Sequence, residues 1–483
     1  MRVRISQGLL LIGLVFMVGL ASAELDQQIL AKVKELQASG ELAPNSVLRV
    51  TVKQGNRASF LGQQQQLRRQ WEEATGMLLD LGLMPQKPAK KHLQENPNLD
   101  LIVARNSEYP DLYHQQLILP LDDLLAQLDL PFHEDDDFFL KAAQSRFAET
   151  TLAIPADGDL LLLYLRQDLL DDPEEQQAFL ENYGYALAPP GTWQEYRDHL
   201  KFFHRPEENL YGSVELRDPQ VAWMYWLPRF VSQAAPYYPL FDEQMKPLVN
   251  TPEGWAATES YLETLTFSPS KVHQPGSGYD AALPYFHRGE AYSLLITVAG
   301  AKLFNRNAEL RESYSVYPLP GIQHSEGLVR RTSLAYGNNL VIPATSENPE
   351  LALLFALWFT SPRISTQAIS LSTSFVDPFR FSHFEQQKLL DVYGQAALNA
   401  LQTSLPLAVP AGTGLPGNTA YLKSLNQALG QASRGELSAQ QAMAQVEQEW
   451  EAITKSYGRE KQRRLWQYQL ALYPEKIEER GNE

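Results

Sequence analysis

The chain has 483 residues, and its 41 Lys and Arg against 57 Asp and Glu give a formal net charge of −16 at pH 7. This acidic balance argues against nucleic acid or an anionic membrane as partner, because both attract clustered basic residues. The absence of cysteine excludes disulfides, thiolate catalysis and Cys-based metal sites. A hydrophobic content of 44% is enough for a large core, so the length indicates two or three domains or one large two-lobed unit.

The N-terminus has the three-part pattern of a secretory signal peptide. Arg2 and Arg4 are followed by an apolar run at 8–20 and by small residues at 21–23. The apolar run is shorter than the roughly 20 residues of a comfortable membrane span, although an N-terminal anchor is the alternative. No cysteine follows for lipid attachment. We therefore expect a signal peptide over residues 1–23 and a periplasmic mature protein.

Strands and helices alternate along the rest of the chain. Short apolar or alternating runs predict strands at 48–52, 99–103 and 160–165. Periodicity and capping residues predict helices at 61–81, after 119–125, from Thr192, at 251–265, at 349–359 and at 438–453. This order indicates an α/β fold with a mostly parallel sheet. The charged residues after about Tyr457 predict a polar C-terminal extension at 458–483.

No catalytic or metal-binding motif is present in a convincing context. Residues 412–417 match the glycine pattern of dinucleotide-binding loops, but Pro410 and Pro416 favour an ordinary loop. The histidines lack metal-ligand spacing, and the acidic run at 135–137 lacks the Gly and Glu of a calcium loop. We expect no enzyme activity, no cofactor and no metal. A pair of glycosidase carboxylates stays open, because their separation is a spatial property.

Aromatic residues are abundant and clustered. The chain has 22 Tyr, 20 Phe and 8 Trp, with groups at 223–226, 237–238, 279–286 and 375–381. Sugars are bound by flat aromatic faces together with amide, carboxylate or Arg hydrogen-bonding groups. The group around Trp223 is the best stacking candidate, and ordinary core packing is the alternative.

Eight segments, in chain order, are similar to the motifs of one family. They lie at 71–76 (W-E-E-A-T-G), 96–102, 119–123, 154–164, 190–196 (P-G-T-W-Q-E-Y), 286–291, 317–321 and 435–450. From about residue 45 to 457 the chain resembles the family 1 extracellular solute-binding proteins, the periplasmic receptors of ABC importers. The most similar branch binds sugars, polyols or glycerol-phosphate-type ligands.

The resemblance implies an α/β, two-lobed periplasmic-binding-protein fold with three hinge crossings, of the type II-like kind. Lobe one is expected at 46–154 plus 333–380, and lobe two at 158–330 plus 385–455. The crossings are expected near 155–159, 330–337 and 379–383. Ligand would bind in the cleft, and a hinge would close the lobes around it.

The resemblance and the positions of the strand ends suggest which residues contact the ligand. These candidates follow strands, lie at crossings or occupy positions where relatives contact ligand: Asn56, Arg105, Asn106, Tyr109, Asp157, Asp159, Trp223, Trp226, Thr297, Tyr336, Asn338, Asp377, Arg380, Asn418 and Tyr421. Arg105 and Arg380 would alternatively hold a phosphate, whereas the aromatic content favours a neutral sugar or polyol.

The resulting hypothesis is a monomeric periplasmic receptor. It captures a sugar or polyol between its lobes and delivers it to the membrane permease of an ABC transporter. The alternatives are a secreted carbohydrate-active enzyme and a receptor for glycerol-phosphate-type ligands.

Overall fold

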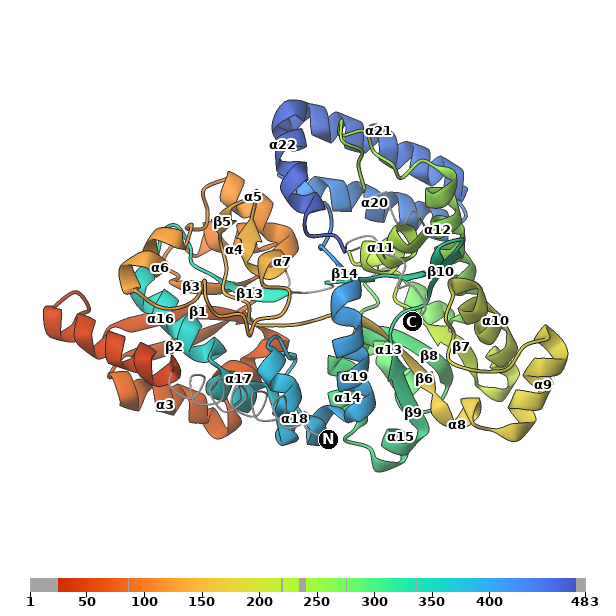
Figure 1. Ribbon diagram of the computed structural model, residues 1–483, viewed down its shortest axis with the longest axis horizontal. Helices are drawn as coiled ribbons and strands as arrows, with labels where there is room; N and C mark the ends of the chain where they lie inside the picture. Colours follow the sequence, from red (N-terminus) through yellow and green to blue (C-terminus); the bar gives the residue numbers. More distant parts are fainter. Residues whose placement is uncertain are drawn as a thin grey trace, which may run out of the picture.

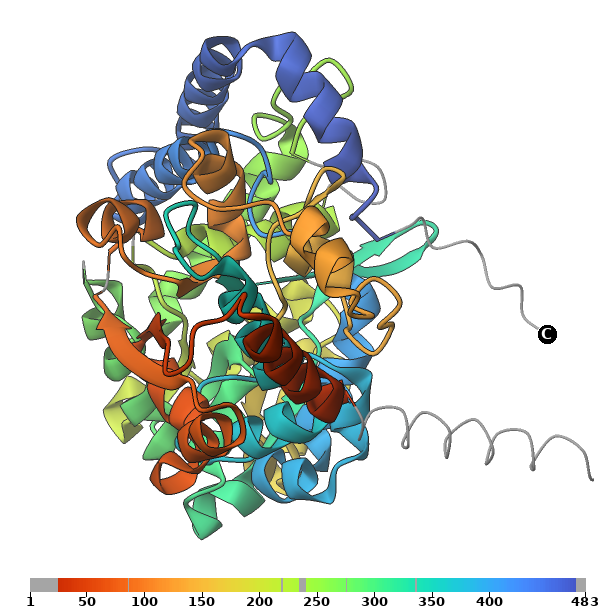
Figure 2. The same cartoon turned by 90° about the vertical axis from the view of Figure 1, so that its left-hand side faces the viewer.

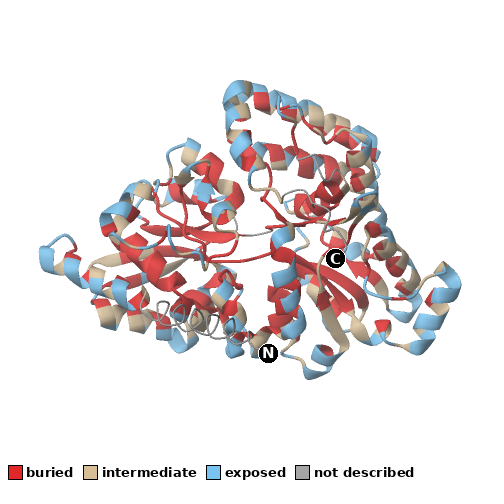
Figure 3. Ribbon diagram, in the orientation of Figure 1, coloured by how far each residue is buried: buried red, intermediate tan, exposed pale blue. Residues whose placement is uncertain are grey.

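The computed structural model describes residues 25–85, 87–218, 220–233, 240–274, 276–334 and 337–474. Two lobes lie side by side (Figure 1), and the helix at residues 25–39 lies across the outside of the first (Figure 2). Buried residues concentrate on the two sheets and on the helix faces that cover them (Figure 3). The predicted signal peptide and the candidate Tyr336 lie outside the described residues.

The first lobe is built on a four-stranded sheet in the order β13-β3-β1-β2. Its strands are β1 (Val47–Lys53), β2 (Leu78–Met84), β3 (Leu101–Arg105) and β13 (Asn338–Val341). β1 runs parallel to both β2 and β3, whereas β13 returns antiparallel to β3. The surrounding helices are α2 (Arg57–Leu61), α3 (Gln66–Thr75), α4 (Ala89–Glu95), α5 (Tyr109–His114), α6 (Asp122–Leu128), α7 (Lys141–Ser145), α16 (Pro349–Thr360) and α17 (Pro362–Ile369).

The second lobe has its own four-stranded sheet, in the order β7-β8-β6-β9. Its strands are β6 (Leu161–Arg166), β7 (Tyr211–Val214), β8 (Ala291–Thr297) and β9 (Tyr314–Tyr317). β6 is antiparallel to both of its neighbours, and β7 is parallel to β8. The expectation of a mostly parallel sheet is therefore wrong for this lobe, because the direction of each strand follows from its connections, to which local sequence gives no clue.

Thirteen helices of the described residues belong to or follow this second sheet. They are α8 (Gln167–Leu170), α9 (Pro173–Tyr183), α10 (Trp193–Phe203), α11 (Ala222–Gln233), α12 (Pro252–Glu263), α13 (Tyr279–His287), α14 (Ala299–Phe304), α15 (Ala308–Ser313), α18 (Gln387–Tyr393), α19 (Gln395–Ser404), α20 (Asn418–Ser433), α21 (Ala439–Tyr457) and α22 (Arg459–Leu470). The short strand pairs are β4 (Arg146–Phe147) with β5 (Thr150–Thr151), β10 (Gly321–His324) with β11 (Gly327–Arg330), and β12 (Thr332–Ser333) with β14 (Ala408–Val409). No helix of the described residues has both the length and the apolar character of a bilayer span.

Several helices begin where their capping residues predict. Thr192 and Ser438 form capping boxes at the starts of α10 and α21. The single helical stretch predicted at 61–81 is wrong at its end. Gly76 adopts a left-handed φ of 70° that ends α3, and the following residues form β2 against β1.

The described chain passes between the lobes three times, which confirms the two-lobed fold. Ile154 still bridges to Leu340 of the first sheet, and β6 then begins the second sheet. β12 pairs with β14 beside the second sheet, and β13 then joins the first. Finally α17 packs on α2, whereas α18 packs on α14. The segment predicted as a polar extension contains helix α22, whose Trp466 is fully buried.

Candidate functional site

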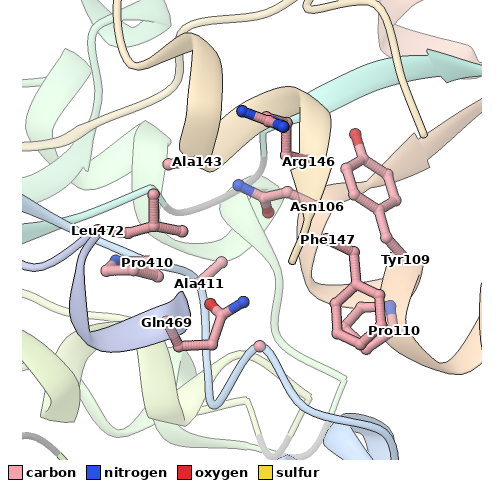
Figure 4. Close-up of a pocket in the computed structure, with 11 residues that line it drawn as sticks. Asn106, Tyr109, Pro110, Ala143, Arg146, Phe147, Pro410, Ala411, Gln469 and Leu472 are labelled. Carbon is pink, nitrogen blue, oxygen red and sulfur yellow. The ribbon is translucent and has the colours of Figure 1, made fainter. Parts of the chain in front are cut away.

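A cavity with about 320 Å³ of empty space lies between the two lobes (Figure 4). Side chains of the first lobe, the loop after β14 and the end of α22 line it: Asn106, Tyr109, Pro110, Ala143, Arg146, Phe147, Pro410, Ala411, Gly414, Gln469 and Leu472. The lining combines two carboxamides, a phenol and a guanidinium with apolar rings and chains. Such a mixture suits a small ligand with both hydroxyl groups and C–H faces.

Asn106 is placed at the cavity by the end of β3. It begins the 3₁₀ turn η3 (Asn106–Glu108), and its backbone N–H donates to the Gly337 carbonyl (3.2 Å). A Cβ at Gly337 would lie 2.6 Å from Asn106 Nδ2, so the glycine permits this close approach. Nδ2 is buried and has no hydrogen-bond partner among the described residues. Its Oδ1 accepts from the Ser107 backbone N–H (2.9 Å), so Nδ2 is the atom of this amide that a further partner could satisfy.

The lobes also bind each other directly beside the cavity. The carboxylate of Asp111, on α5, accepts hydrogen bonds from the backbone N–H groups of Gly417 (2.6 Å) and Thr419 (2.9 Å). Asn418 Nδ2 donates in return to the Ser107 carbonyl (2.6 Å). The N-terminus of a helix carries unpaired N–H groups and partial positive charge. A carboxylate of the first lobe thus caps α20 of the second lobe.

Three carboxylates gather where the passages between the lobes meet. Asp157 Oδ1 accepts the Asp377 N–H (2.9 Å), and Asp157 Oδ2 accepts Asn338 Nδ2 (2.9 Å). Asp159 completes the group, and oxygens of all three carboxylates lie within 4.8 Å of one another. We call Asp157, Asp159, Asp377 and the neighbouring Lys302 the junction cluster. One residue from each passage is therefore connected through Asp157.

Gly158 separates the two aspartates of the first passage for a steric reason. A Cβ on this residue would collide with the backbone carbonyl of Pro378. Only glycine allows the first and third passages to lie this close. The Asp-Gly-Asp sequence is thus the local signature of the crossing.

Lys302 supplies the positive charge of the junction cluster. Its Nζ lies 3.7 Å from Asp377 Oδ1 and donates to the carbonyls of Ser374 (3.1 Å) and Val376 (2.6 Å). The hydroxyl of Tyr393 also donates to Asp377 Oδ1 (2.7 Å). On the other side, Lys53 Nζ donates to Asn338 Oδ1. Lys302 belongs to α14 of the second lobe, whereas Lys53 lies at the end of β1 in the first lobe.

Burial changes the protonation of this cluster. Burial, reinforced by the charge of Asp377, raises the pKa of Asp157 to about 7. Burial and the charges of Asp157 and Asp377 raise the pKa of Asp159 well above its ordinary value. Burial lowers the pKa of Lys302 to about 8. The cluster therefore holds shared protons near neutral pH in place of three full negative charges.

The same carboxylates are the residues of the described chain that could hold a metal ion. Oxygen ligands of this kind suit hard cations such as calcium. The Lys302 ammonium already provides a counter-charge at 3.7 Å from Asp377, and an additional cation would be repelled by it. We therefore interpret the cluster as a structural link, in which hydrogen bonds and opposite charges hold the passages together.

Most of the candidate residues lie in two neighbouring places. Asn106 and Tyr109 line the cavity, and Asn418 bonds the lobes beside it. The junction cluster and its surroundings contain Asp157, Asp159, Thr297, Asn338 and Asp377. Burial lowers the pKa of Lys53, and the charge of nearby Arg105, at the end of β3, adds to this lowering; together they bring the pKa to about 7. Asn56 is buried in the 3₁₀ turn η1 (Gln54–Asn56) that follows β1.

The structure places the predicted aromatic platform elsewhere. Trp223 and Trp226 are buried in α11, within the core of the second lobe. Trp226 stacks on Phe230 with ring centroids 4.7 Å apart, and its indole N–H donates to Thr258. Tyr421 is likewise buried and hydrogen-bonded to Thr454. These rings stabilise the lobe and do not line the cavity.

Arg380 is committed to structure within the first lobe. Its NH1 contacts the carboxylates of Asp135 (2.9 Å) and Asp137 (3.2 Å), and Nε donates to the Thr360 carbonyl. The guanidinium also lies 3.6 Å from the centre of the Phe138 ring. With its charge paired and 1% of its surface exposed, it is not positioned to hold a ligand phosphate.

Sequence reasoning missed three polar residues of this region. Lys302 had a visible signal, since it is the only charged residue in the apolar run 291–304. Asp111 had no such signal in the sequence, because a carboxylate on a short helix is usually exposed. Gln469 was missed because it lies in the segment taken for a polar extension.

The fold and the interlobe cavity define a two-lobed binding protein. The model of the bacterial extracellular solute-binding protein family matches residues 86–365, more than half of the chain, and the protein belongs to this family. No curated protein matches the chain.

Solved structures share the fold at low identity. Maltose-bound MalE3 of T. maritima is 18% identical, with a TM-score of 0.68 over 84% of this chain and 100% of that one. A ribitol-bound ABC transporter solute-binding protein of Agrobacterium radiobacter K84 is 17% identical, with a TM-score of 0.67 over 85% and 99%. The GacH receptor of Streptomyces glaucescens, also solved with acarbose, is 18% identical, with a TM-score of 0.65 over 86% and 100%.

Proposed function

We propose that this solute-binding protein captures a sugar or polyol between its lobes and delivers it to the membrane permease of an ABC transporter. The observation that carries the proposal is the interlobe cavity, with amide, phenol and apolar groups on facing walls. Neighbouring folds hold maltose, ribitol and acarbose, which are all rich in hydroxyl groups. Among the candidates, Asn56, Arg105, Asn106, Tyr109 and Asn418 are the proposed ligand contacts.

A neutral ligand fits the charges better than a phosphate. Arg380 is paired with two aspartates, and Arg146 is the cation in the cavity lining. Arg146 is an exposed residue that donates to the Glu149 carbonyl, so its charge is largely hydrated. We propose no catalytic role for the junction carboxylates, because they are at most 5% exposed.

We further propose that the protein is exported to the periplasm by its N-terminal signal, residues 1–23, and acts as a monomer. The lobes are proposed to comprise 46–154 plus 333–380 and 158–330 plus 385–455. Support comes from the two separate sheets and from the extracellular character of the family. N-terminal sequencing of the protein from the periplasm tests the cleavage after residue 23.

A thermal-shift screen tests the ligand class. The panel contains ribitol, D-mannitol, D-glucose, maltose, acarbose and glycerol 3-phosphate. We expect a sugar or polyol to raise the melting temperature in a concentration-dependent way, because it binds only the folded state. Ligand recovered after denaturation should be chemically unchanged. Turnover of the recovered compound would contradict a receptor, and a shift with glycerol 3-phosphate alone would contradict a neutral ligand.

A further inference from the structure

The C-terminal helix α22 reaches the ligand cavity. Its last turn contributes Gln469, and Leu472 follows just beyond the helix. Figure 4 shows both on the side of the cavity across from Tyr109 and Phe147 of the first lobe. These residues lie beyond the segment 86–365 that the family model matches. The cavity therefore has a wall that the matched segment does not provide.

This wall is held firmly against the second lobe. The Trp466 ring is fully buried, and its indole N–H donates to the Phe241 carbonyl (3.2 Å). Gln462 Nε2 donates to the Pro416 carbonyl (2.7 Å) in the loop before α20. Leu465 packs against the large hydrophobic cluster and also against the smaller one, which lies in the first lobe. The helix position, and with it the position of Gln469, is thus fixed before a ligand arrives.

The Gln469 carboxamide lies directly over Gly414. A Cβ at Gly414, which has a φ of +64°, would collide with the Gln469 side chain, so the glycine makes room for the amide. Gln469 is 4% exposed, and its carboxamide lines the cavity. The Nδ2 of Asn106, another lining amide, is buried without a hydrogen-bond partner among the described residues. A buried amide group without a partner costs free energy unless a ligand or water satisfies it.

We propose that Gln469 of α22 is a ligand-contacting residue that selects a small neutral polyhydroxylated ligand, namely a linear polyol or a single sugar ring. This inference rests on the proposed function. A carboxamide both donates and accepts, which matches a hydroxyl group and gives no advantage to a charged ligand. Gln469 and Leu472 close the cavity on the side opposite the first lobe. A longer oligosaccharide would meet the wall formed by α22.

The test compares Gln469→Met with Gln467→Met in the full-length mature protein. Gln467 lies on the same helix but is exposed, so it is the matched control. Dissociation constants for ribitol, D-mannitol, D-glucose and maltose are measured by calorimetry, and the melting temperature without ligand monitors folding. We expect Q469M to weaken binding of the best single-ring or linear probe about tenfold, while Q467M matches the wild type.

The outcomes separate this inference from the proposed function. Equal affinities of the wild type and Q469M would overturn the role of Gln469 and leave the receptor intact. Tighter binding of maltose than of every small probe would overturn the size limit. No binding of any probe by the wild type would overturn the proposed function, and this inference with it.

Discussion

Buried charges are stabilised in two different ways, one inside the second lobe and one between the lobes. Inside the second lobe, Glu215 lies between Arg229 (2.9 Å) and Arg217 (3.0 Å). The two guanidinium groups lie over the rings of Trp193 and Tyr261, with distances of 4.2 and 4.1 Å to the ring centroids. Burial would raise the pKa of Glu215, but the two arginines lower it below its ordinary value. Permanent ions of opposite sign pair here, with two positive charges against one negative charge.

The junction cluster has the opposite balance, with three carboxylates and one close lysine. Asp159 Oδ1 and Asp377 Oδ2 are buried without a hydrogen-bond partner among the described residues. Protons, rather than fixed cations, must therefore reduce its negative charge. The interior of the second lobe thus holds a permanent ion triad, whereas the crossing region holds groups that titrate.

Removing the carboxylate of the lobe triad should have the largest effect. Glu215→Gln leaves Arg217 and Arg229 buried without their counter-charge, and we expect a loss of about 3–5 kcal/mol in unfolding free energy. The loss should be nearly constant from about pH 5 to about pH 8, because the lowered pKa keeps Glu215 ionised throughout. Urea unfolding measures it, with the exposed Glu207→Gln as control. A strong pH dependence would contradict the permanent triad.

Removing the lysine of the junction should cost less and depend on pH. Lys302→Met deletes the nearest positive charge, and we expect a loss of about 2 kcal/mol near pH 7. At about pH 5 the loss should be smaller, because the carboxylates of raised pKa take up protons instead. The exposed Lys388→Met is the matched control. Equal losses at both pH values would show that protons do not replace the lysine.

Much of the fold was predictable, because its signals are local. The capping boxes of Thr192 and Ser438 predict where two helices start. The alternation of apolar and polar residues predicts strand β1. β2 was missed because Leu78 and Leu81 continue the helical spacing of Trp71 and Ala74, which only pairing with β1 overrides. The strand directions of the second sheet were missed for a similar reason, since pairing partners are distant in sequence.

The site was predictable only where backbone position determines it. Asn106 follows a buried strand, and Asp157 lies at a crossing, so the order of motifs was enough to place them. The partners of a side chain could not be predicted in this way. Nothing near Arg380 in sequence reveals Asp135 and Asp137 as its partners, and nothing near Trp226 shows that its ring faces the core. Burial and pairing arise from tertiary contacts.

A neutral substitute in the junction should stabilise the protein at high pH. Asp159 has a folded-state pKa well above its unfolded value, so the folded protein holds a proton that the unfolded chain releases. Stability should therefore fall as pH rises from about 4 towards the folded-state pKa. Asp159→Asn imitates the protonated form, and we expect a gain of about 1 kcal/mol at pH 8 with a flatter pH profile. The exposed Asp123→Asn should keep the wild-type profile, and a steeper profile in D159N would contradict the shared-proton interpretation.

The smallest effect should come from the contact that joins the lobes beside the cavity. Asp111→Asn keeps one acceptor for α20 but loses the second acceptor and the negative charge at the helix N-terminus, which is worth about 1 kcal/mol or less. Both lobes keep their own cores, so the melting temperature should hardly change. The unliganded protein should instead open, which X-ray scattering would show as a larger radius of gyration. Ligand should bind a few-fold more weakly, because part of its binding free energy is then used to close the lobes. An unchanged radius together with unchanged affinity would show that the junction cluster alone sets the angle between the lobes.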